Sequence, residues 1–301
     1  MFRPKRQVSS PLIFILSVVL LTFVLSSISF ADATKSKEHF NKGVTLEKAG
    51  NLQGALKEYK SSIAEDPSYI DAYINKGNIH FKLKQYNDAL RSFKSATEKD
   101  PKNVSAFKNL SLVQSKMKRY TDAVASLNTA IGVKASADLY AELGKIYYRQ
   151  KNHKQVVATL DKCHQMGGGS HLSYFMLGKA YNSLKQSSKA ITALNKSVSL
   201  KSKNYNALSA LGQIYLGQGK YRKAATNFKK AMRVNSKKYR ASYNYAIAVE
   251  SADPENYSVN IQNWEKFIRI AKSNPKAKKE VSQARDHVKE LKEANESASL
   301  Q

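Results

Sequence analysis

The sequence has little of the chemistry on which catalytic and metal sites depend. Cys163 is the only cysteine in 301 residues, so no internal disulfide is possible. The six histidines show no spacing typical of metal ligation, and no nucleophile motif is present. We therefore expect no metal, no cofactor and no enzymatic activity.

Acidic residues are absent from a long central stretch. Residues 162–249 hold 16 Lys or Arg and not one Asp or Glu, and the whole chain has a formal net charge of +27. A solvated surface usually mixes both signs, so this stretch indicates either an anionic partner or simple solubility.

The glycine-rich stretch from Gly212 to Lys220 lacks the residues that a phosphate-binding loop requires. Gly219-Lys220 suggests a phosphate-binding loop, but that motif requires Ser or Thr after the Gly-Lys pair. Tyr221 follows Lys220 instead, and the interval from Gly212 to Gly219 has the wrong length. We expect no nucleotide-binding loop here and assign these glycines a structural role.

What the chain does have is a pattern with a nearly fixed period. A small residue (Val in one case) is followed four residues later by an aromatic or Leu, and three residues after that by another small one. The sets are Ala55, Tyr59, Ser62; Ala89, Phe93, Ala96; Ala123, Leu127, Ala130; Val156, Leu160, Cys163; Ala190, Leu194, Ser197; and Ala224, Phe228, Ala231. Their first members lie 34, 34, 33, 34 and 34 residues apart. Such a period is typical of a solenoid of repeated units.

A second pattern recurs in phase with the first and predicts two amphipathic helices per unit, each of roughly a dozen residues. It consists of small residues placed where two helix backbones approach closely. They are Gly43, Gly77, Ser111, Gly144, Gly178, Gly212 and Ala246. Over about residues 36–271 the chain resembles the tetratricopeptide repeat family. The resemblance implies an all-α solenoid of about seven helix pairs over 36–272, with repeats starting near residues 36, 70, 104, 137, 171, 205 and 239.

The N-terminus has the pattern of a secretory signal. Arg3, Lys5 and Arg6 precede an apolar core at 12–25, and residues 12–30 carry no charge. We expect residues 1–33 to be a signal peptide or, alternatively, an uncleaved anchor. Either way the repeats lie outside the cytoplasm, in a periplasmic, secreted or inner-membrane-anchored protein, and the pattern is typical of the bacterial envelope.

The C-terminal end departs from the repeat pattern. The seventh unit has a turn lengthened by about two residues at 250–255, with Trp264 at the aromatic position and Phe267 at a usually small one. After Asn274-Pro275, an apolar stripe predicts a capping helix over 275–293, followed by a flexible tail at 294–301. The stripe is Ala277, Val281, Ala284, Val288 and Leu291.

The resemblance also implies a candidate binding groove, because first helices line the concave side of the family's solenoids. The candidate groove residues are Asn41, Asn75, Asn78, Phe81, Lys108, Asn109, Lys145, Tyr148, Phe175 and Lys179. Asn41, Asn75 and Asn109 recur at intervals of 34, and such amides can bond an extended peptide backbone. Asparagine is also common at this position in the family, so a purely structural role stays open.

A second candidate surface is basic and lies on second helices, which form the convex side in the family. Its residues are Lys189, Lys196, Arg222, Lys223, Lys229, Lys230 and Arg233. Nucleic acid is the usual partner of such a patch, but export makes it an unexpected one here. Two functions follow as hypotheses: a scaffold that binds a protein or peptide through the groove, or a structural envelope protein that binds anionic lipid, lipopolysaccharide or wall polymer.

Overall fold

The computed structural model describes residues 33–299, and within them all regular structure is helical. The sequence-predicted all-α fold of consecutive helix pairs is confirmed. The helices divide into two compact units, with the boundary between Ala135 and Ser136. We call the two helices of each pair the first and the second helix.

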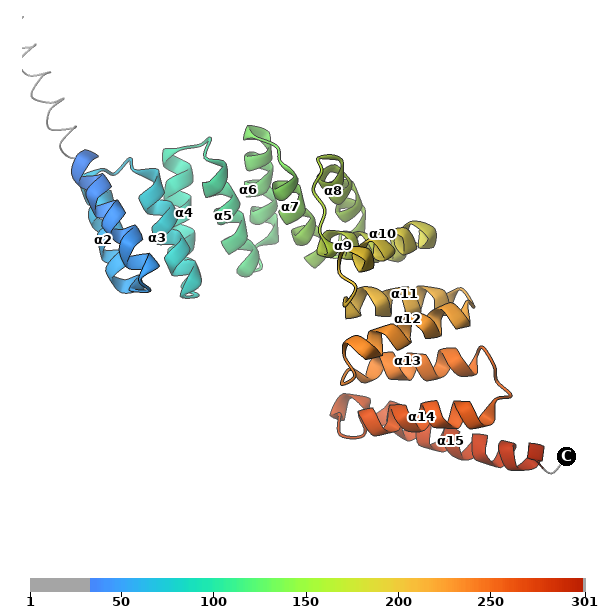
Figure 1. Cartoon of the computed structure of the whole chain (residues 1–301). Coiled ribbons are helices and arrows are strands. Elements are labelled where there is room, and N and C mark those ends of the chain that lie inside the picture. The colour runs from blue at the N-terminus through green and yellow to red at the C-terminus, as the bar shows by residue number, and fades with distance from the viewer. Residues whose placement is uncertain (1–32, 300–301) are drawn as a thin grey trace, which may run out of the picture. The chain divides into compact units, whose positions relative to one another are not determined.

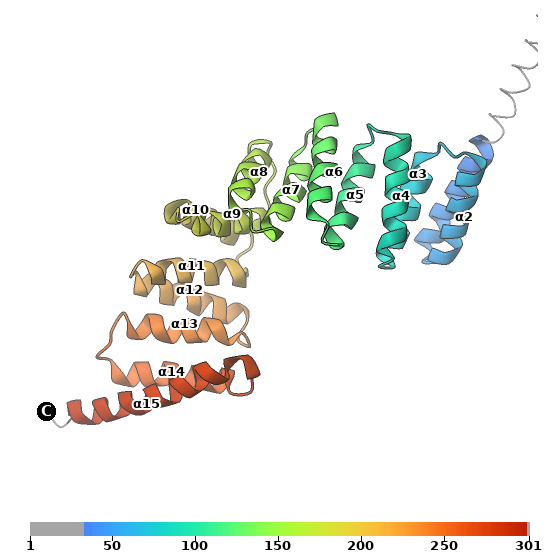
Figure 2. The same cartoon turned by 180° about the vertical axis from the view of Figure 1, so that it is seen from behind.

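The first unit contains three helix pairs, which stand side by side in both cartoon views (Figures 1 and 2). Helical residues 33–48 pair with α2 (Leu52–Glu65). The next pair is α3 (Ile70–Lys82) with α4 (Tyr86–Lys99), and the third is α5 (Val104–Lys116) with α6 (Tyr120–Val133).

The second unit contains four pairs and a final helix. The pairs are α7 (Ala137–Arg149) with α8 (His153–Gln165), α9 (His171–Ser183) with α10 (Ser187–Leu200), α11 (Tyr205–Gly217) with α12 (Tyr221–Val234), and α13 (Tyr239–Glu250) with α14 (Tyr257–Ala271). A short 3-10 turn, Pro275–Ala277, then leads into α15 (Lys278–Ser299).

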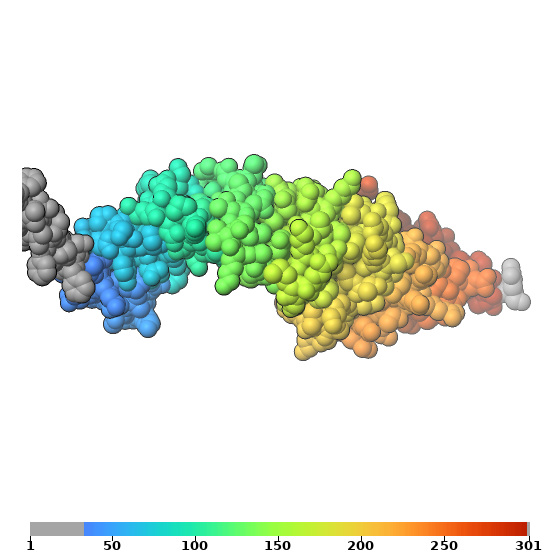
Figure 3. All heavy atoms as spheres, turned by 90° about the horizontal axis from the view of Figure 1, so that it is seen from above, coloured from blue at the N-terminus to red at the C-terminus, as the bar shows by residue number. Residues whose placement is uncertain are grey.

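Each pair is held by a small residue of the first helix against a large one of the second. A Cβ on Gly77 would lie 2.6 Å from Phe93 Cε1, and one on Gly212 would lie 2.6 Å from Phe228 Cε1. Both rings are almost fully buried. The glycines therefore set the distance between the helices, and side chains fill the space that the ribbons leave between them (Figure 3).

The turn inside each of the first six pairs contains one residue in the left-handed conformation. These residues are Gly50, Lys84, Lys118, Lys151, Lys185 and Gly219, with φ between 58° and 80°. Such a residue ends an α-helix by turning the chain so that the last carbonyls can be bonded. Four of the six positions thus hold lysine where the geometry favours glycine. Gly219 of the apparent phosphate loop is one of these helix ends.

The last pair and α15 share one core. Phe267 is fully buried and its ring centroid lies 5.1 Å from that of Tyr243 and 6.1 Å from that of Trp264. The expected apolar stripe, Ala277 in the 3-10 turn and Val281 to Leu291 in α15, is buried against this cluster. The helix itself begins at Lys278 and continues to Ser299, so it extends past residue 293, where we expected the cap to give way to a flexible tail.

The expected signal peptide or anchor at 1–33 lies almost wholly outside the described residues. Across 33–299, none of the helices combines the length and apolar character that a membrane span requires.

Candidate peptide-binding face and basic face

In the first unit, predicted groove residues meet across neighbouring repeats. Asn109 Nδ2 on α5 donates a hydrogen bond to Asn78 Oδ1 on α3 at 3.3 Å. Asn75 Nδ2 donates to Tyr59 Oη on α2 at 3.4 Å. Both bonds are longer than the usual 2.7–3.2 Å for N–H···O contacts, so they are weak. The amides of Asn75 and Asn109 are therefore held only weakly, one by the Tyr59 hydroxyl and the other by Asn78.

The other predicted residues of this face differ in exposure. Asn41 is exposed on the first helix, and Lys108 is half-buried on α5. Phe81 is half-buried, with its ring centroid 5.6 Å from that of Tyr86. We call Asn41, Asn75, Asn78, Phe81, Lys108 and Asn109 the first-helix face of the first unit.

Glu47, Tyr59 and Lys82 link the repeats of this face by hydrogen bonds, and the sequence did not predict that role. Glu47 accepts from Lys82 Nζ at 2.5 Å and from Tyr59 Oη at 3.0 Å, so it links the first repeat to the second. Burial, and to a smaller extent the nearby Glu47 carboxylate, raise the pKa of Tyr59 to about 12. The Tyr59 hydroxyl thus remains protonated and donates to Glu47 while it accepts from Asn75.

In the second unit, four predicted groove residues lie on α7 and α9. Lys145 Nζ donates to Glu142 Oε1 at 2.6 Å within α7, so that charge is compensated. Tyr148 and Phe175 have ring centroids 6.5 Å apart and join the two helices through an apolar contact. Burial raises the pKa of Tyr148. Lys179 is half-buried on α9.

The predicted basic residues are all exposed on α10 and α12. None of the seven is in an ion pair with a described carboxylate. Lys189 Nζ lies 5.6 Å from the ring centroid of Tyr181, and Lys223 Nζ lies 5.9 Å from that of Tyr215. We call this surface the basic second-helix face.

Among residues 33–299 no group of three or more His, Cys, Asp or Glu is placed to hold a metal ion. Cys163 is buried, and burial raises the pKa of its thiol, which disfavours the reactive thiolate. It packs as a small apolar residue, as its place in the repeat pattern predicts.

The fold defines a class, the α-solenoids built from repeated helix pairs. Three family models, each described as a tetratricopeptide repeat, match residues 46–112, 172–204 and 209–253. The chain belongs to the tetratricopeptide repeat family, whose members generally act as non-catalytic scaffolds for protein interactions. A search of curated proteins gave no match.

Solved structures share the fold at low sequence identity. The C-terminal part of a tetratricopeptide repeat protein from Cytophaga hutchinsonii has a TM-score of 0.65 at 18% identity, and the match covers 79% of this chain and 97% of that one. A tetratricopeptide repeat protein from Parabacteroides merdae has a TM-score of 0.56 at 16% identity, covering 83% and 98%. A chain of the APC/C hetero-tetramer Cut9–Hcn1 has a TM-score of 0.53 at 14% identity, covering 80% and 48%.

Proposed function

We propose that this protein is a scaffold of the cell envelope and that the first-helix face of its first unit binds an extended segment of a partner protein. The observation that carries the proposal is the asparagine row. Asn75 and Asn109 donate through bonds of 3.4 and 3.3 Å, and a peptide backbone can replace such weak bonds with shorter ones.

The chemistry around the row indicates what kind of segment fits. Phe81 supplies apolar surface beside the amides, and Lys108 supplies positive charge on the neighbouring repeat. A segment with an acidic and an apolar side chain would therefore bind best. In the second unit, Tyr148, Phe175 and Lys179 offer the same combination as a separate contact.

The test is a crosslinking capture from intact cells that compares the wild type with Asn75→Ala/Asn109→Ala. We expect the double variant to lose one specific protein partner at physiological salt while its melting temperature stays close to that of the wild type. Asn128→Ala is the matched control, because Asn128 is exposed on the second helix α6. Unchanged capture by the double variant would refute the proposed face.

The basic second-helix face supports a second candidate function, adhesion to an anionic envelope surface. Basic residues near an anionic membrane contribute about 1 kcal/mol each, so the seven exposed cations together favour association. Reversal of Lys223, Lys229 and Lys230 to Glu should weaken binding to anionic vesicles, and high salt should do the same. If this reversal abolishes capture of the protein partner instead, the basic face is the protein-binding site.

The placement in the envelope rests on the N-terminal sequence pattern. A fusion of residues 1–40 to a reporter that is active only outside the cytoplasm should be active, because Arg3, Lys5 and Arg6 precede the uncharged stretch 12–30. A reporter that stays inactive in the cytosol would remove the envelope from the proposal and leave the peptide-binding face unaffected.

A further inference from the structure

One position of the first helices, directly before the small packing residue, differs between repeats. Leucine occupies it in four of them, and all four side chains are buried: Leu110, Leu143, Leu177 and Leu211. In the first two repeats the same position holds Lys42 and Lys76. These two repeats thus have lysine at a position where four others have a buried leucine and the seventh has Tyr245.

In the first repeat the protein supplies its own counter-charge. Lys42 Nζ lies 2.8 Å from Glu58 Oε1, and the Glu58 side chain is only 11% exposed. The residue that corresponds to Glu58 in the second repeat, 34 positions later, is Ser92. The hydroxyl of Ser92 donates to the backbone oxygen of Asp88 at 2.9 Å. Lys76 therefore lacks the carboxylate that its counterpart Lys42 has.

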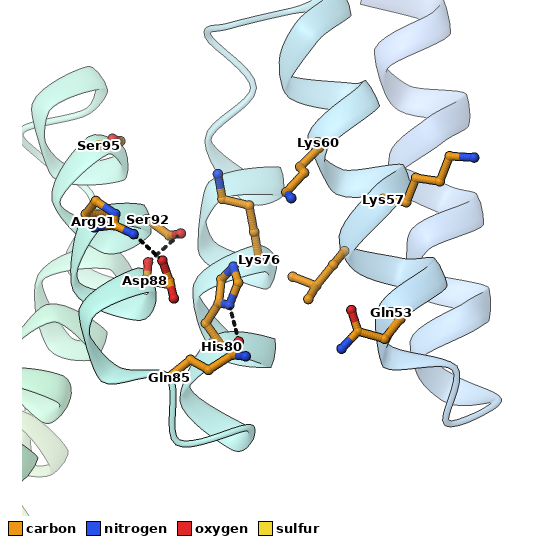
Figure 4. Close-up of a pocket in the computed structure, with 11 residues that line it drawn as sticks. Gln53, Lys57, Lys60, Lys76, His80, Gln85, Asp88, Arg91, Ser92 and Ser95 are labelled. Atoms are coloured by element: carbon orange, nitrogen blue, oxygen red, sulfur yellow. Dashed lines mark hydrogen bonds and ion pairs between the residues drawn. The ribbon is translucent and has the colours of Figure 1, made fainter.

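A hollow of about 700 Å³ lies at this place, between the second helices α2 and α4 and over α3. Figure 4 shows Lys60 from α2 and Lys76 from α3 approaching the same space, with Ser92 and Arg91 of α4 on its far side. His80 Nδ1 is bonded to Gln85 Oε1 at 2.7 Å at one end of the hollow. Polar hydrogen-bonding groups thus line its walls.

Positive charge in the hollow exceeds negative charge. Arg91 is ion-paired with Asp88, the one acidic residue of the lining. None of the three lysines of the lining, Lys57, Lys60 and Lys76, takes part in an ion pair among the described residues. The Lys57 side chain is directed away from the other two (Figure 4). Burial lowers the pKa of Lys76, and the charge of Lys60 lowers it further. Lys60 is exposed and Lys76 is half-buried. Lys76 Nζ lies 5.5 Å from the ring centroid of Tyr73, and the charge of Asp88, which Arg91 shares, offsets part of the effect of Lys60 on it. The two ammonium groups thus lie close together without a carboxylate at ion-pair distance.

We propose that this hollow is a binding site for a dianionic phosphate group, which takes the place that the Glu58 carboxylate has in the first repeat and bridges Lys60 and Lys76. A dianion carries a negative charge for each of the two ammonium groups, whereas a carboxylate carries only one. The lining of the hollow includes none of Asn75, Asn78 and Asn109, so the proposed phosphate site and the proposed peptide-binding face use different side chains.

Inorganic phosphate titrated into the full-length protein, followed by isothermal calorimetry, tests the site. We expect Lys76→Gln and Lys60→Gln each to weaken binding about tenfold, as the loss of one charge-assisted hydrogen bond would do. Ser92→Glu should abolish binding, because it places in the hollow the carboxylate that the first repeat has. The same substitution should leave the melting temperature unchanged or raised.

Two variants serve as matched controls. Lys102→Gln removes a positive charge and Ser105→Glu adds a negative one, and both residues are exposed outside the hollow. Both variants should bind phosphate like the wild type. The proposal is overturned by absence of phosphate binding in the wild type, by unchanged binding in Lys76→Gln, or by equal losses in Ser92→Glu and Ser105→Glu.

A phosphate group can come from a soluble phosphate ester or from a lipid headgroup, and a second arm distinguishes these sources. Vesicles of phosphatidylcholine with phosphatidic acid are sedimented with wild type, Lys76→Gln and Lys102→Gln at physiological salt. A loss of co-sedimentation confined to Lys76→Gln assigns the headgroup as ligand. Equal co-sedimentation of all three, together with the calorimetric loss, assigns a soluble phosphate.

Discussion

The indole Nε1 of Trp264 donates a hydrogen bond to Glu250 Oε2 at 2.6 Å. The other oxygen of this carboxylate lies 2.8 Å from His287 Nε2 on α15. Glu250, the last residue of α13, thus links α13 to both α14 and the capping helix α15.

Removal of that carboxylate should loosen the cap. We expect Glu250→Ala to lower the free energy of unfolding by about 1–3 kcal/mol, because the buried Trp264 N–H loses its acceptor. Hydrogen exchange should become faster in α15 before it does in α9 or α10. Glu255→Ala, in the exposed part of the turn that follows Glu250, is the control and should have little effect. Equal destabilisation by both variants would show that Glu250 does not hold the cap.

The close contact between first and second helices gives a second prediction. A Cβ on Gly178 would lie 2.6 Å from Leu194 Cγ and 3.2 Å from the backbone oxygen of Ala190. Gly178→Ala should therefore destabilise the fold, since overpacking costs about 1–3 kcal/mol and exceeds the gain in helix propensity. Gly217→Ala adds the same methyl group to α11 where no atom lies within 4 Å. It should be neutral or stabilising in the same thermal melts.

The fold class could be predicted from the sequence because it depends on spacing. A small residue at a fixed distance from a large one decides which helix faces meet, and Gly77 with Phe93 or Gly212 with Phe228 makes this visible without coordinates. The length of α15 could not be predicted in the same way. Its residues after Leu291 carry no large apolar side chain, and no Gly or Pro stands among residues 292–299, so no break in the pattern marks where it ends.

The candidate sites were less accessible to sequence reasoning. The contacts of Glu47 with Lys82 and Tyr59 join different repeats, and side-chain rotamers decide them. The phosphate-site candidate did leave a signal, since Lys76 breaks a leucine pattern and Ser92 replaces the glutamate of the first repeat. A comparison of the repeats with one another at every position, and not only at the packing residues they share, indicates this site.

The third prediction concerns the lysines whose backbone is in the left-handed conformation. Lys185 has a φ of 61°, a conformation that strains a side chain with a Cβ. We expect Lys185→Gly to stabilise the protein by about 0.5–1 kcal/mol, because glycine adopts this conformation without strain. Lys189→Gly, in the first turn of α10, should instead destabilise by up to about 1 kcal/mol. Denaturant midpoints that move in the same direction for both variants would contradict the assignment.

The last prediction concerns pH and the carboxylate of Glu58, which is buried while its partner Lys42 is exposed. The hydrogen bond from Lys42 lowers the pKa of Glu58 below its ordinary 4.5, and His39, with Nδ1 2.7 Å from Oε2, lowers it further. Because the folded state holds the Glu58 proton less tightly, this carboxylate stabilises the fold above the ordinary pKa. That contribution is lost as the pH falls through the lowered folded-state pKa.

Glu58→Gln should therefore be less stable than the wild type at neutral pH by up to about 1 kcal/mol, because both basic side chains that contact Glu58 are substantially exposed and solvent screens the interaction. The difference should narrow as the pH falls from about 7 to about 3, because protonation removes the same charge from the wild type. Glu98→Gln is the control, since Glu98 is exposed and its nearest cation, Lys94 Nζ, lies 3.9 Å away. If the difference in the free energy of unfolding between wild type and Glu58→Gln stays constant over this pH range, Glu58 contributes through packing rather than through its charge. In that case the comparison of Lys42 with Lys76 would no longer indicate a missing anion.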